Sequence, residues 1–321
     1  MINDGLYKPR RFSPKHRAWR ERRPCLGQLV QLDGSDHDWF DGRAPRCVLL
    51  IFIDDATSRI LYGLFIPVED TFNLLTAARV YLLLHGRPVS FYVDKDSIYK
   101  VNRQATIEEE LKDDQPITQF TRAMDDLDVK VLCAHSPQAK GRVERGFHTH
   151  QDRLVKELRL RNISSVPQAN KFLLDVYFPD HNRRCAVEPA RPDDAHRPLL
   201  KSHNLHQILS LRSPRVIAND FTLRFQNRFF QLLKDQPVRV RPGNTVLIET
   251  RLDGSSHIRF KDLYLNSKII SKKPYRPTFA ARPKTPAKPP RIGPLKPAPD
   301  HPWRSFRLDR RTLIATSTTT P

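Results

Sequence analysis

The sequence lacks the cysteine patterns of zinc fingers and of disulfide-rich domains. It contains four cysteines, Cys25, Cys47, Cys133 and Cys185. They lie far apart and form no Cys-x-x-Cys pair, so we expect reduced, mostly buried thiols. His148 and His150 are two residues apart, which places them on different faces of a helix. That spacing, without a cysteine pair nearby, does not suit a zinc site.

The sequence also lacks long apolar runs. None approaches the roughly 18–20 residues that a membrane span needs, and the basic N-terminus is not followed by the apolar stretch of a signal peptide. We therefore expect no membrane association and a cytoplasmic protein associated with the nucleoid. At 321 residues and 39% hydrophobic, the chain is long enough for one or two cores, and we expect two folded domains.

Acidic residues are scarce at both ends of the chain. The formal net charge is +20. Residues 8–23 contribute a net seven of these charges and residues 268–310 a net ten, whereas the middle is nearly balanced. This distribution indicates a folded core with two basic arms that bind a polyanion, with nucleic acid as the expected partner. The alternative is that the arms only keep the chain soluble.

Three acidic residues stand at positions typical of element ends. Asp33 follows the strand-like run 28–32, and Asp94 follows the run 89–93. Glu144 lies one turn into a helix expected to begin near Gln138. Brought together across a sheet, the three carboxylates would form an oxygen-ligand site for a pair of divalent metal ions, which is suited to phosphoryl-transfer chemistry.

The other elements predict an α/β domain. The apolar runs 47–53 and 59–66 flank a turn and predict a hairpin. A helix from Asp70 or Thr71 to about His85 follows, and strand 89–94 comes next. Further predicted elements are a helix at 118–127, a strand at 129–133, and helices at 138–160 and 166–178. This order is that of a ribonuclease H-like mixed five-stranded sheet with flanking helices, in which the first and fourth strands are neighbours.

Four segments carry a resemblance to a known family. They are Gln31–Phe40, Ile53–Arg59, Asp94–Lys95 and Ser136–Arg145, the last containing Ser-Pro-Gln-Ala-Lys-Gly-Arg-Val-Glu. The chain resembles the integrase-core transposases of bacterial insertion sequences, in particular the group called ISNCY, from about Cys25 to Pro198 and more weakly to Ile270. The resemblance implies a DDE triad of Asp33, Asp94 and Glu144 that binds two Mg²⁺ or Mn²⁺ ions.

One departure from the family concerns the N-terminus. Relatives usually begin with helix-turn-helix DNA-binding modules, whereas only 32 residues precede Asp33 here. We therefore expect a chain that is N-terminally truncated relative to the family and lacks those modules. Such a protein would recognise transposon ends poorly unless another product supplied that recognition.

Basic residues surround the predicted triad. We expect DNA contacts from six of them: Lys95, Lys140, Arg142, Arg145, Arg153 and Lys156. Those that follow Lys140 lie on one predicted helix, several of them three or four residues apart and so on a shared flank. Because Asp152 and Glu157 are interleaved with them, a salt-bridged solvent face is the alternative, and we expect a mixture of both.

Other acids near the triad need a separate interpretation. Asp54 and Asp55 are most simply hairpin-turn residues that accept backbone hydrogen bonds. Asp36, Asp38 and Asp96 are interpreted as solvated loop carboxylates in preference to residues that support the metal site.

From about Ser213 the pattern changes to short β-rich runs separated by turn pairs, which predicts a small SH3-like β-barrel. Six arginines are expected on its outside: Arg224, Arg228, Arg239, Arg241, Arg251 and Arg259. They would serve DNA binding, although a purely structural or oligomerising barrel is the alternative. The Pro-rich basic segment beyond Ser271 cannot bury a core and should be disordered or extended.

We divide the chain into five parts: a basic arm (1–24), a ribonuclease H-like integrase catalytic core (25–182), a linker (183–212), the small β-barrel (213–270) and the Pro-rich basic tail (271–321). The predicted function is metal-dependent cleavage and strand transfer of DNA during transposition of an insertion sequence. The expected partners are transposon ends and target DNA, with a homo-oligomer assembling on them. The alternatives are an inactive DNA-binding remnant and a ribonuclease H-type nuclease.

Overall fold

The computed structural model describes residues 21–94, 98–99, 116–133, 141–271 and 298–304. For residues 141–145 it gives the backbone only. By internal contacts, Met1–Ser271 forms one compact unit and Lys272–Pro321 a second. Among the helices in these described ranges, none has the length and apolar character to cross a membrane. The five-part division of the chain stays a prediction.

A five-stranded sheet forms the centre of the first part of the chain. Its strands are β1 (Val30–His37), β2 (Cys47–Asp54), β3 (Ile60–Ile66), β4 (Ser90–Val93) and β5 (Lys130–Cys133). They lie in the order β3-β2-β1-β4-β5. The first three strands pair antiparallel, whereas β1–β4 and β4–β5 pair in parallel. This is the mixed topology expected of a ribonuclease H-like fold, so the predicted fold class is confirmed.

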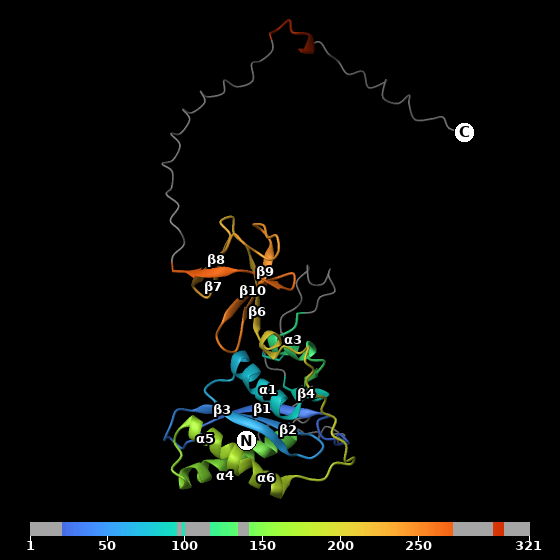
Figure 1. The fold of residues 1–321 in the computed structure, drawn as a ribbon, viewed down its shortest axis with the longest axis vertical. Helices are drawn as coiled ribbons and strands as arrows, with labels where there is room; N and C mark the ends of the chain where they lie inside the picture. Colours follow the sequence, from blue (N-terminus) through green and yellow to red (C-terminus); the bar gives the residue numbers. More distant parts are fainter. Residues whose placement is uncertain (1–20, 95–97, 100–115, 134–140, 272–297, 305–321) are drawn as a thin grey trace, which may run out of the picture. The chain divides into compact units, whose positions relative to one another are not determined.

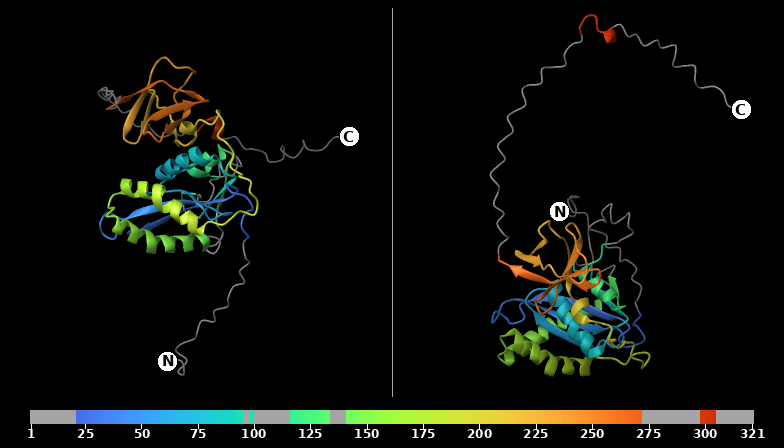
Figure 2. Two further views of the ribbon diagram at one scale, coloured as in Figure 1. Left: turned by 60° about the horizontal axis from the view of Figure 1, so that its bottom comes forward. Right: turned by 45° about the horizontal axis from the view of Figure 1, so that its top comes forward.

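Helices cover both faces of the sheet (Figure 1). They are α1 (Thr71–His85), α3 (Gln119–Asp125), α4 (Gly141–Leu160), α5 (Val166–Phe172), the π-helical turn η2 (Leu173–Tyr177), α6 (Phe178–Cys185) and the short α7 (Leu205–Ile208). The unit Lys272–Pro321 contains the 3₁₀ turn η3 (Pro302–Arg304). Figure 2 shows α1 and α3 on one face and α4, α5 and α6 on the other. The bounds of α1 follow from its caps: the Asp70 carboxylate accepts from the Asn73 N–H at 2.7 Å, and Gly86 ends the helix with φ of 85°.

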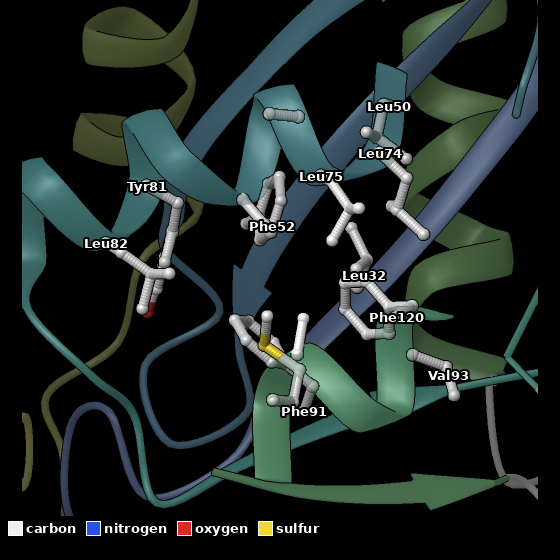
Figure 3. Packing of buried hydrophobic residues seen from close by; sticks show 14 of the residues in the cluster. Leu32, Leu50, Phe52, Leu74, Leu75, Tyr81, Leu82, Phe91, Val93 and Phe120 are labelled. Carbon is white, nitrogen blue, oxygen red and sulfur yellow. The ribbon is translucent and has the colours of Figure 1, made fainter. Parts of the chain in front are cut away.

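Alternating side chains along the strands build two separate cores. Leu32, Leu50 and Phe52 pack against α1 and α3, as Figure 3 shows. The intervening residues Leu49 and Ile51 pack instead with Leu154, Leu158 and other residues of the helices on the opposite face. Because side chains alternate along a strand, Asp33 and Ser35 share the α4 face, and Gln151 of α4 donates to the Ser35 hydroxyl at 3.1 Å.

The outer edge of β3 is closed by two asparagine side chains. Asn170 accepts from the Phe65 N–H at 2.6 Å and donates to the Phe65 carbonyl at 3.1 Å. Asn182 makes the same pair of bonds with Ile60, both at 2.8 Å. Each amide side chain makes the two hydrogen bonds that a neighbouring strand would make. These backbone groups of the edge are therefore not available for pairing with another chain.

Residues 211–270 form seven further strands. They are β6 (Leu211–Val216), β7 (Thr222–Phe225), β8 (Arg228–Leu232), β9 (Thr245–Thr250), β10 (Ser256–Phe260), β11 (Leu263–Tyr264) and β12 (Ser267–Ile270). They form a four-stranded sheet, β11-β10-β9-β6, and a three-stranded sheet, β12-β8-β7, around one apolar core. A small β domain is thus present where one was predicted, and β6 begins two residues before the expected start.

The prediction that Arg259 lies outside this β domain is wrong. Its side chain is 13% exposed and pairs at 2.7 Å with Glu249, which is fully buried. The Tyr264 hydroxyl donates a hydrogen bond to the other carboxylate oxygen of Glu249 at 2.9 Å. A buried carboxylate needs a paired cation, and this requirement overrides strand alternation. Arg224, Arg228, Arg239 and Arg241 are exposed, as expected, and Arg251 is half-buried over the Tyr264 ring.

Candidate active site

Asp33 lies in the part of β1 that no longer pairs with β4 and pairs only with β2. The parallel ladder between β1 and β4 joins only Val30 and Gln31 to Phe91 and Tyr92. Asp33 comes two residues after this ladder, and Asp94 directly follows β4. The carboxyl ends of parallel strands that part from each other commonly form a binding site at that edge of a sheet.

The expectation that Asp33 ends its strand is wrong. β1 continues to His37, and Asp33 pairs with Ile51 of β2. The polar residues 35–37 stay in the strand because β2 extends alongside them over its full length. Asp33 is therefore held by a ladder on its β2 side. Asp94 was expected at the end of its strand, and this placement is confirmed.

The charges of both aspartates act on the buried residue Tyr99. The residue is buried, and its hydroxyl donates to the Glu69 carboxylate at 3.1 Å. Burial raises the pKa of Tyr99 well above its usual value, and the charges of Glu69, Asp94 and Asp33 raise it further. Both predicted aspartates thus lie close enough to act electrostatically on one buried side chain.

Glu144 is the fourth residue of α4, as expected for a position one turn into that helix. The helix packs on β1 through the Gln151–Ser35 hydrogen bond, on the face that Asp33 shares. The side chains of Glu144, Arg142 and Arg145 lie outside the described atoms, and Lys95 and Lys140 lie outside the described residues. The structure therefore places the backbone of the third predicted ligand and leaves its carboxylate undescribed.

Two of the three predicted metal ligands, Asp33 and Asp94, have described side chains. Among the described side chains, no group of three or more His, Cys, Asp or Glu residues is arranged to hold a metal ion. Asp33 and Asp94 supply two carboxylates, the hard oxygen donors that Mg²⁺ and Mn²⁺ prefer. The chemistry of this pair fits a divalent cation, and a third carboxylate has to come from a side chain outside the described set.

The two other predicted DNA contacts on α4 take part in ion pairs. Arg153 pairs with Glu157 at 3.0 Å and with Asp180 of α6 at 3.1 Å. Lys156 pairs with Asp152 at 2.5 Å and remains 58% exposed. These contacts favour the salt-bridged alternative for this part of the helix. Its buried stripe, formed by Leu154, Leu158 and the half-buried Val155, is as expected.

Asp54 and Asp55 do lie at the hairpin between β2 and β3, and they do more than cap a turn. Asp54 is fully buried and accepts from the Thr57 N–H at 2.8 Å, the Thr57 hydroxyl at 2.7 Å and the Gly27 N–H at 2.9 Å. Asp55 accepts from Gln31 at 2.7 Å and from the Arg23 N–H at 3.0 Å. The two carboxylates therefore fasten the segment before β1 to the hairpin.

Burial raises the pKa of Asp54, whereas its hydrogen bonds from Thr57 and Gly27 oppose that shift and the charge of Asp55 adds to it. Of the remaining acids, Asp36 is exposed near Arg46 and Asp38 accepts from the Gly42 N–H. Asp36 is thus solvated but lies in strand β1, so its placement in a loop is wrong, whereas Asp38 is half-buried just after that strand. Asp96 lies outside the described residues.

Neither the cysteines nor the histidines form a metal site among the described residues. All four cysteines are free, but only Cys47 is buried, so the expectation of mostly buried thiols is wrong. His150 is fully buried and its Nδ1 lies 2.9 Å from the Tyr177 hydroxyl. Burial, with a smaller contribution from nearby His181, lowers the pKa of His150 to about 3. His150 is thus a neutral core residue.

Sequence reasoning missed Glu69 and Tyr99. Glu69 lies outside the predicted elements, directly before the α1 cap, and Tyr99 follows Asp94 by five residues without any local motif. The one available signal is Gly34, which sits within a strand beside Asp33. A glycine in such a position indicates that another group approaches the backbone closely.

Comparison with known proteins identifies two named relatives. The putative transposase y4bF of Sinorhizobium fredii is 39% identical over 273 residues, which cover 85% of this chain and 58% of that protein. The transposase for insertion sequence IS1202 of Streptococcus pneumoniae is 29% identical over 283 residues, covering 87% and 58%. The chain thus spans somewhat more than half the length of both relatives. No protein-family model matches it.

Among solved structures, a chain of the simian T-cell lymphotropic virus intasome is 13% identical with a TM-score of 0.41, covering 78% of this chain and 83% of that one. The HTLV-2 integrase catalytic core in complex with magnesium is 16% identical with a TM-score of 0.33, covering 48% and 90%. At TM-scores this low, the likeness does not by itself establish fold or function. In sequence, the chain is thus similar to one protein named as a putative transposase and to one named as the transposase for an insertion sequence.

Proposed function

We propose that this protein is a DDE transposase that cleaves and joins DNA strands with Asp33, Asp94 and Glu144 as ligands of two Mg²⁺ or Mn²⁺ ions. The observation that carries the proposal is the position of Asp33 and Asp94 where β1 and β4 part. The names of the two sequence relatives support it. The approach of α4 to β1 also supports it, because Glu144 lies in the first turn of that helix.

Each carboxylate has a defined structural role in this proposal. When bound, two metal ions activate a water molecule or a DNA 3′-hydroxyl and stabilise the leaving oxygen of the phosphate. Asp33 offers its carboxylate from a strand that the β2 ladder holds in place. Asp94 offers its own from the position directly after β4. No side chain has to act as a nucleophile.

We further propose that DNA is held by basic residues close to these acids. Lys95 is adjacent to Asp94 in the chain, and Lys140, Arg142 and Arg145 flank Glu144. The substrates would be transposon ends and target DNA. Because two ends have to be cut and joined together, we expect at least a dimer on DNA.

The decisive experiment supplies labelled pre-nicked DNA ends and a target plasmid with Mn²⁺, and compares the wild type with Glu144→Gln. Pre-cut ends lower the demand for recognition and leave the chemical step to the carboxylates. The matched control is Asp152→Asn on the same helix, because Asp152 is 73% exposed and pairs with Lys156 away from the proposed ligands. We expect strand joining by the wild type and the control and none by Glu144→Gln.

Two other outcomes would select other functions. If wild type and Glu144→Gln bind DNA equally well and neither joins strands, the protein is a DNA-binding remnant. If the wild type cuts RNA in a hybrid duplex and leaves DNA ends intact, it is a ribonuclease H-type nuclease. Both alternatives are compatible with the same fold.

A further inference from the structure

A polar cleft of about 550 Å³ lies between the sheet and the helices α4 and α6. Gln31 of β1 lines this α4 cleft on the sheet side, and Gly146 and His150 of α4 line it on the helix side. Gln31 comes two residues before Asp33 and so lies on the same face of β1. Gly146 comes two residues after Glu144. A ligand in the α4 cleft would therefore lie beside DNA held at the proposed active site.

Two buried polar atoms in the wall of the cleft have no hydrogen-bond partner among the described residues. They are Oε1 of Gln31, a residue that is 3% exposed, and Nε2 of His150, which is fully buried. The other polar atom of Gln31, Nε2, donates to Asp55 at 2.7 Å. His150 Nδ1 lies 2.9 Å from the Tyr177 hydroxyl. Fastening the fold thus accounts for one polar atom of each side chain and leaves the other without a purpose.

Gly146 leaves the space beside His150 Nε2 without a side chain. It lies four residues before His150 and so on the same flank of α4. Outside the backbone of the helix, the one described atom within 4 Å of an added Cβ would be His150 Nε2, at an ordinary contact distance of 4.0 Å. Neither packing nor a positive φ requires glycine here, although glycine weakens a helix relative to alanine. The approach of a ligand to His150 Nε2 would account for it.

The chemistry of the cleft favours a neutral polar ligand over a phosphate or a metal ion. The carboxylates of Asp54 and Asp55 in its wall would repel an anion. Burial lowers the pKa of His150 to about 3, so this ring is neutral and offers a phosphate no charge. Among the described side chains, no three His, Cys, Asp or Glu residues are arranged to hold a metal ion. A nucleobase carries both donors and acceptors, and the imidazole of His181 in the same wall offers a surface for stacking.

We infer that the α4 cleft binds one unpaired base of the substrate DNA through hydrogen bonds to Gln31 and His150. The inference rests on the proposed function, which supplies DNA as the substrate. The volume of the cleft lies within the range of small-molecule sites. A base held there fixes the neighbouring phosphate relative to Asp33, and this contributes to the positioning of the reacting strand.

The experiment measures DNA binding to the full chain by fluorescence anisotropy in EDTA, so that no metal-dependent step takes place. One probe is a duplex with a short single-stranded overhang, made in a 3′ and a 5′ version. The other is the same duplex with abasic sugars in the overhang. The two probes have equal phosphate charge and differ only in the overhanging bases. We expect the wild type to bind the probe with bases roughly tenfold more tightly in one of the two versions, the scale of one stacked base.

Gly146→Ala and Gly146→Leu place side chains of increasing size beside His150 Nε2. Both should reduce the preference for the probe with bases, and leucine should reduce it to less than about twofold. Alanine strengthens a helix, so the melting temperature of Gly146→Ala should equal or exceed that of the wild type. A loss of base preference without a loss of stability would separate binding from folding.

Asp152→Leu is the matched control. It places the same side chain on α4 at a position that is 73% exposed and outside the lining of the cleft. The lost charge affects both probes equally, so the roughly tenfold preference should remain. Loss of the preference in the Gly146 variants together with its retention in Asp152→Leu supports the inference.

Three other outcomes are decisive. Equal affinity of the wild type for both probes overturns the inference, and the proposed function stands if strand joining in Mn²⁺ still depends on Glu144. A base preference that both Gly146 variants retain also overturns it, because the base is then held elsewhere. If the wild type joins no strands in Mn²⁺ while Gly146→Leu still abolishes its base preference, the proposed function fails and the base site stands.

Discussion

Two pairs of aspartates lie in strands of the same sheet or directly after them, and their surroundings differ. Asp54 and Asp55 lie at an antiparallel hairpin, where backbone N–H groups and the Thr57 hydroxyl donate to them. Asp33 and Asp94 are half-buried where two parallel strands part, and the charges of both raise the pKa of buried Tyr99. The first pair completes the fold, whereas the second concentrates negative charge at a sheet edge, which is an arrangement suited to a cation.

The largest expected difference between the pairs is in activity. Asp33→Asn or Asp94→Asn should lower metal-dependent DNA joining by at least about a thousandfold, because each removes a charged ligand that the chemistry requires. The melting temperature should change little, since neither residue is fully buried. Joining of pre-cut ends in Mn²⁺ and a thermal unfolding curve measure the two effects. Wild-type activity in Asp94→Asn would remove that residue from the site.

The opposite pattern is expected for Asp54→Asn. A turn aspartate would tolerate asparagine, but Asp54 accepts one hydrogen bond at Oδ1 and two at Oδ2 in a buried site. The new amide NH₂ would face a donor in either orientation. We expect a loss of about 1–3 kcal/mol in the free energy of unfolding, measured by urea denaturation.

The control for Asp54→Asn is Asp36→Asn, an exposed strand residue whose change should cost less than about 0.5 kcal/mol. Mn²⁺ binding by the folded fraction should survive in both variants. Equal unfolding curves for Asp54→Asn and Asp36→Asn would show that the hairpin carboxylate is no more structural than a surface one.

The acid sensitivity of the fold provides a third test near the hairpin pair. His150 lines a cleft of about 550 Å³ together with Asp54 and Asp55, and burial lowers its pKa to about 3. A histidine that stays neutral in the folded state makes its full contribution to the free energy of unfolding above about pH 6.5, the pKa of histidine in the unfolded chain. This contribution is lost as the pH falls toward the pKa in the folded state. One such group contributes a slope of up to about 1.4 kcal/mol per pH unit.

His150→Asn should flatten that slope between about pH 6 and pH 4, because asparagine keeps a polar group near the Tyr177 hydroxyl and does not titrate. Unfolding free energies at several pH values measure it. Exposed His148→Asn is the control on the same helix and should leave the slope as it is. An unchanged slope in His150→Asn would show that other groups, such as His181, carry the acid sensitivity.

Local signals in the sequence were sufficient for much of the fold. The hairpin of β2 and β3 follows from two apolar runs around a turn, and Asp70 and Gly86 define α1 to the residue. The predicted end of β1 was wrong because the length of this strand is set by pairing with β2. The polar residues 35–37 give no sign of that pairing in the sequence.

The surroundings of the candidate site were less predictable. Contacts such as Glu69 with Gly34 and Tyr99 join residues about thirty positions apart and depend on the packed sheet. The same is true of Asn182, which closes the β3 edge at Ile60 from 122 residues away. Candidate ligands could be identified from position and motif, whereas the groups that support them become visible only once distant segments are brought together.

The smallest expected effect concerns the basic residues of α4 and distinguishes its two ends. Arg153 already pairs with Glu157 and Asp180, so Arg153→Gln should change DNA affinity less than twofold, as surface ion pairs contribute roughly 0–1 kcal/mol. Arg142→Gln, close to Glu144, should weaken binding and reduce the slope of log affinity against log salt by about 0.9 if it contacts one phosphate. Fluorescence anisotropy at several salt concentrations measures both variants. A flattened salt slope for Arg153→Gln with an unchanged slope for Arg142→Gln would reverse this assignment and place the DNA along the later turns of α4, away from the carboxylates.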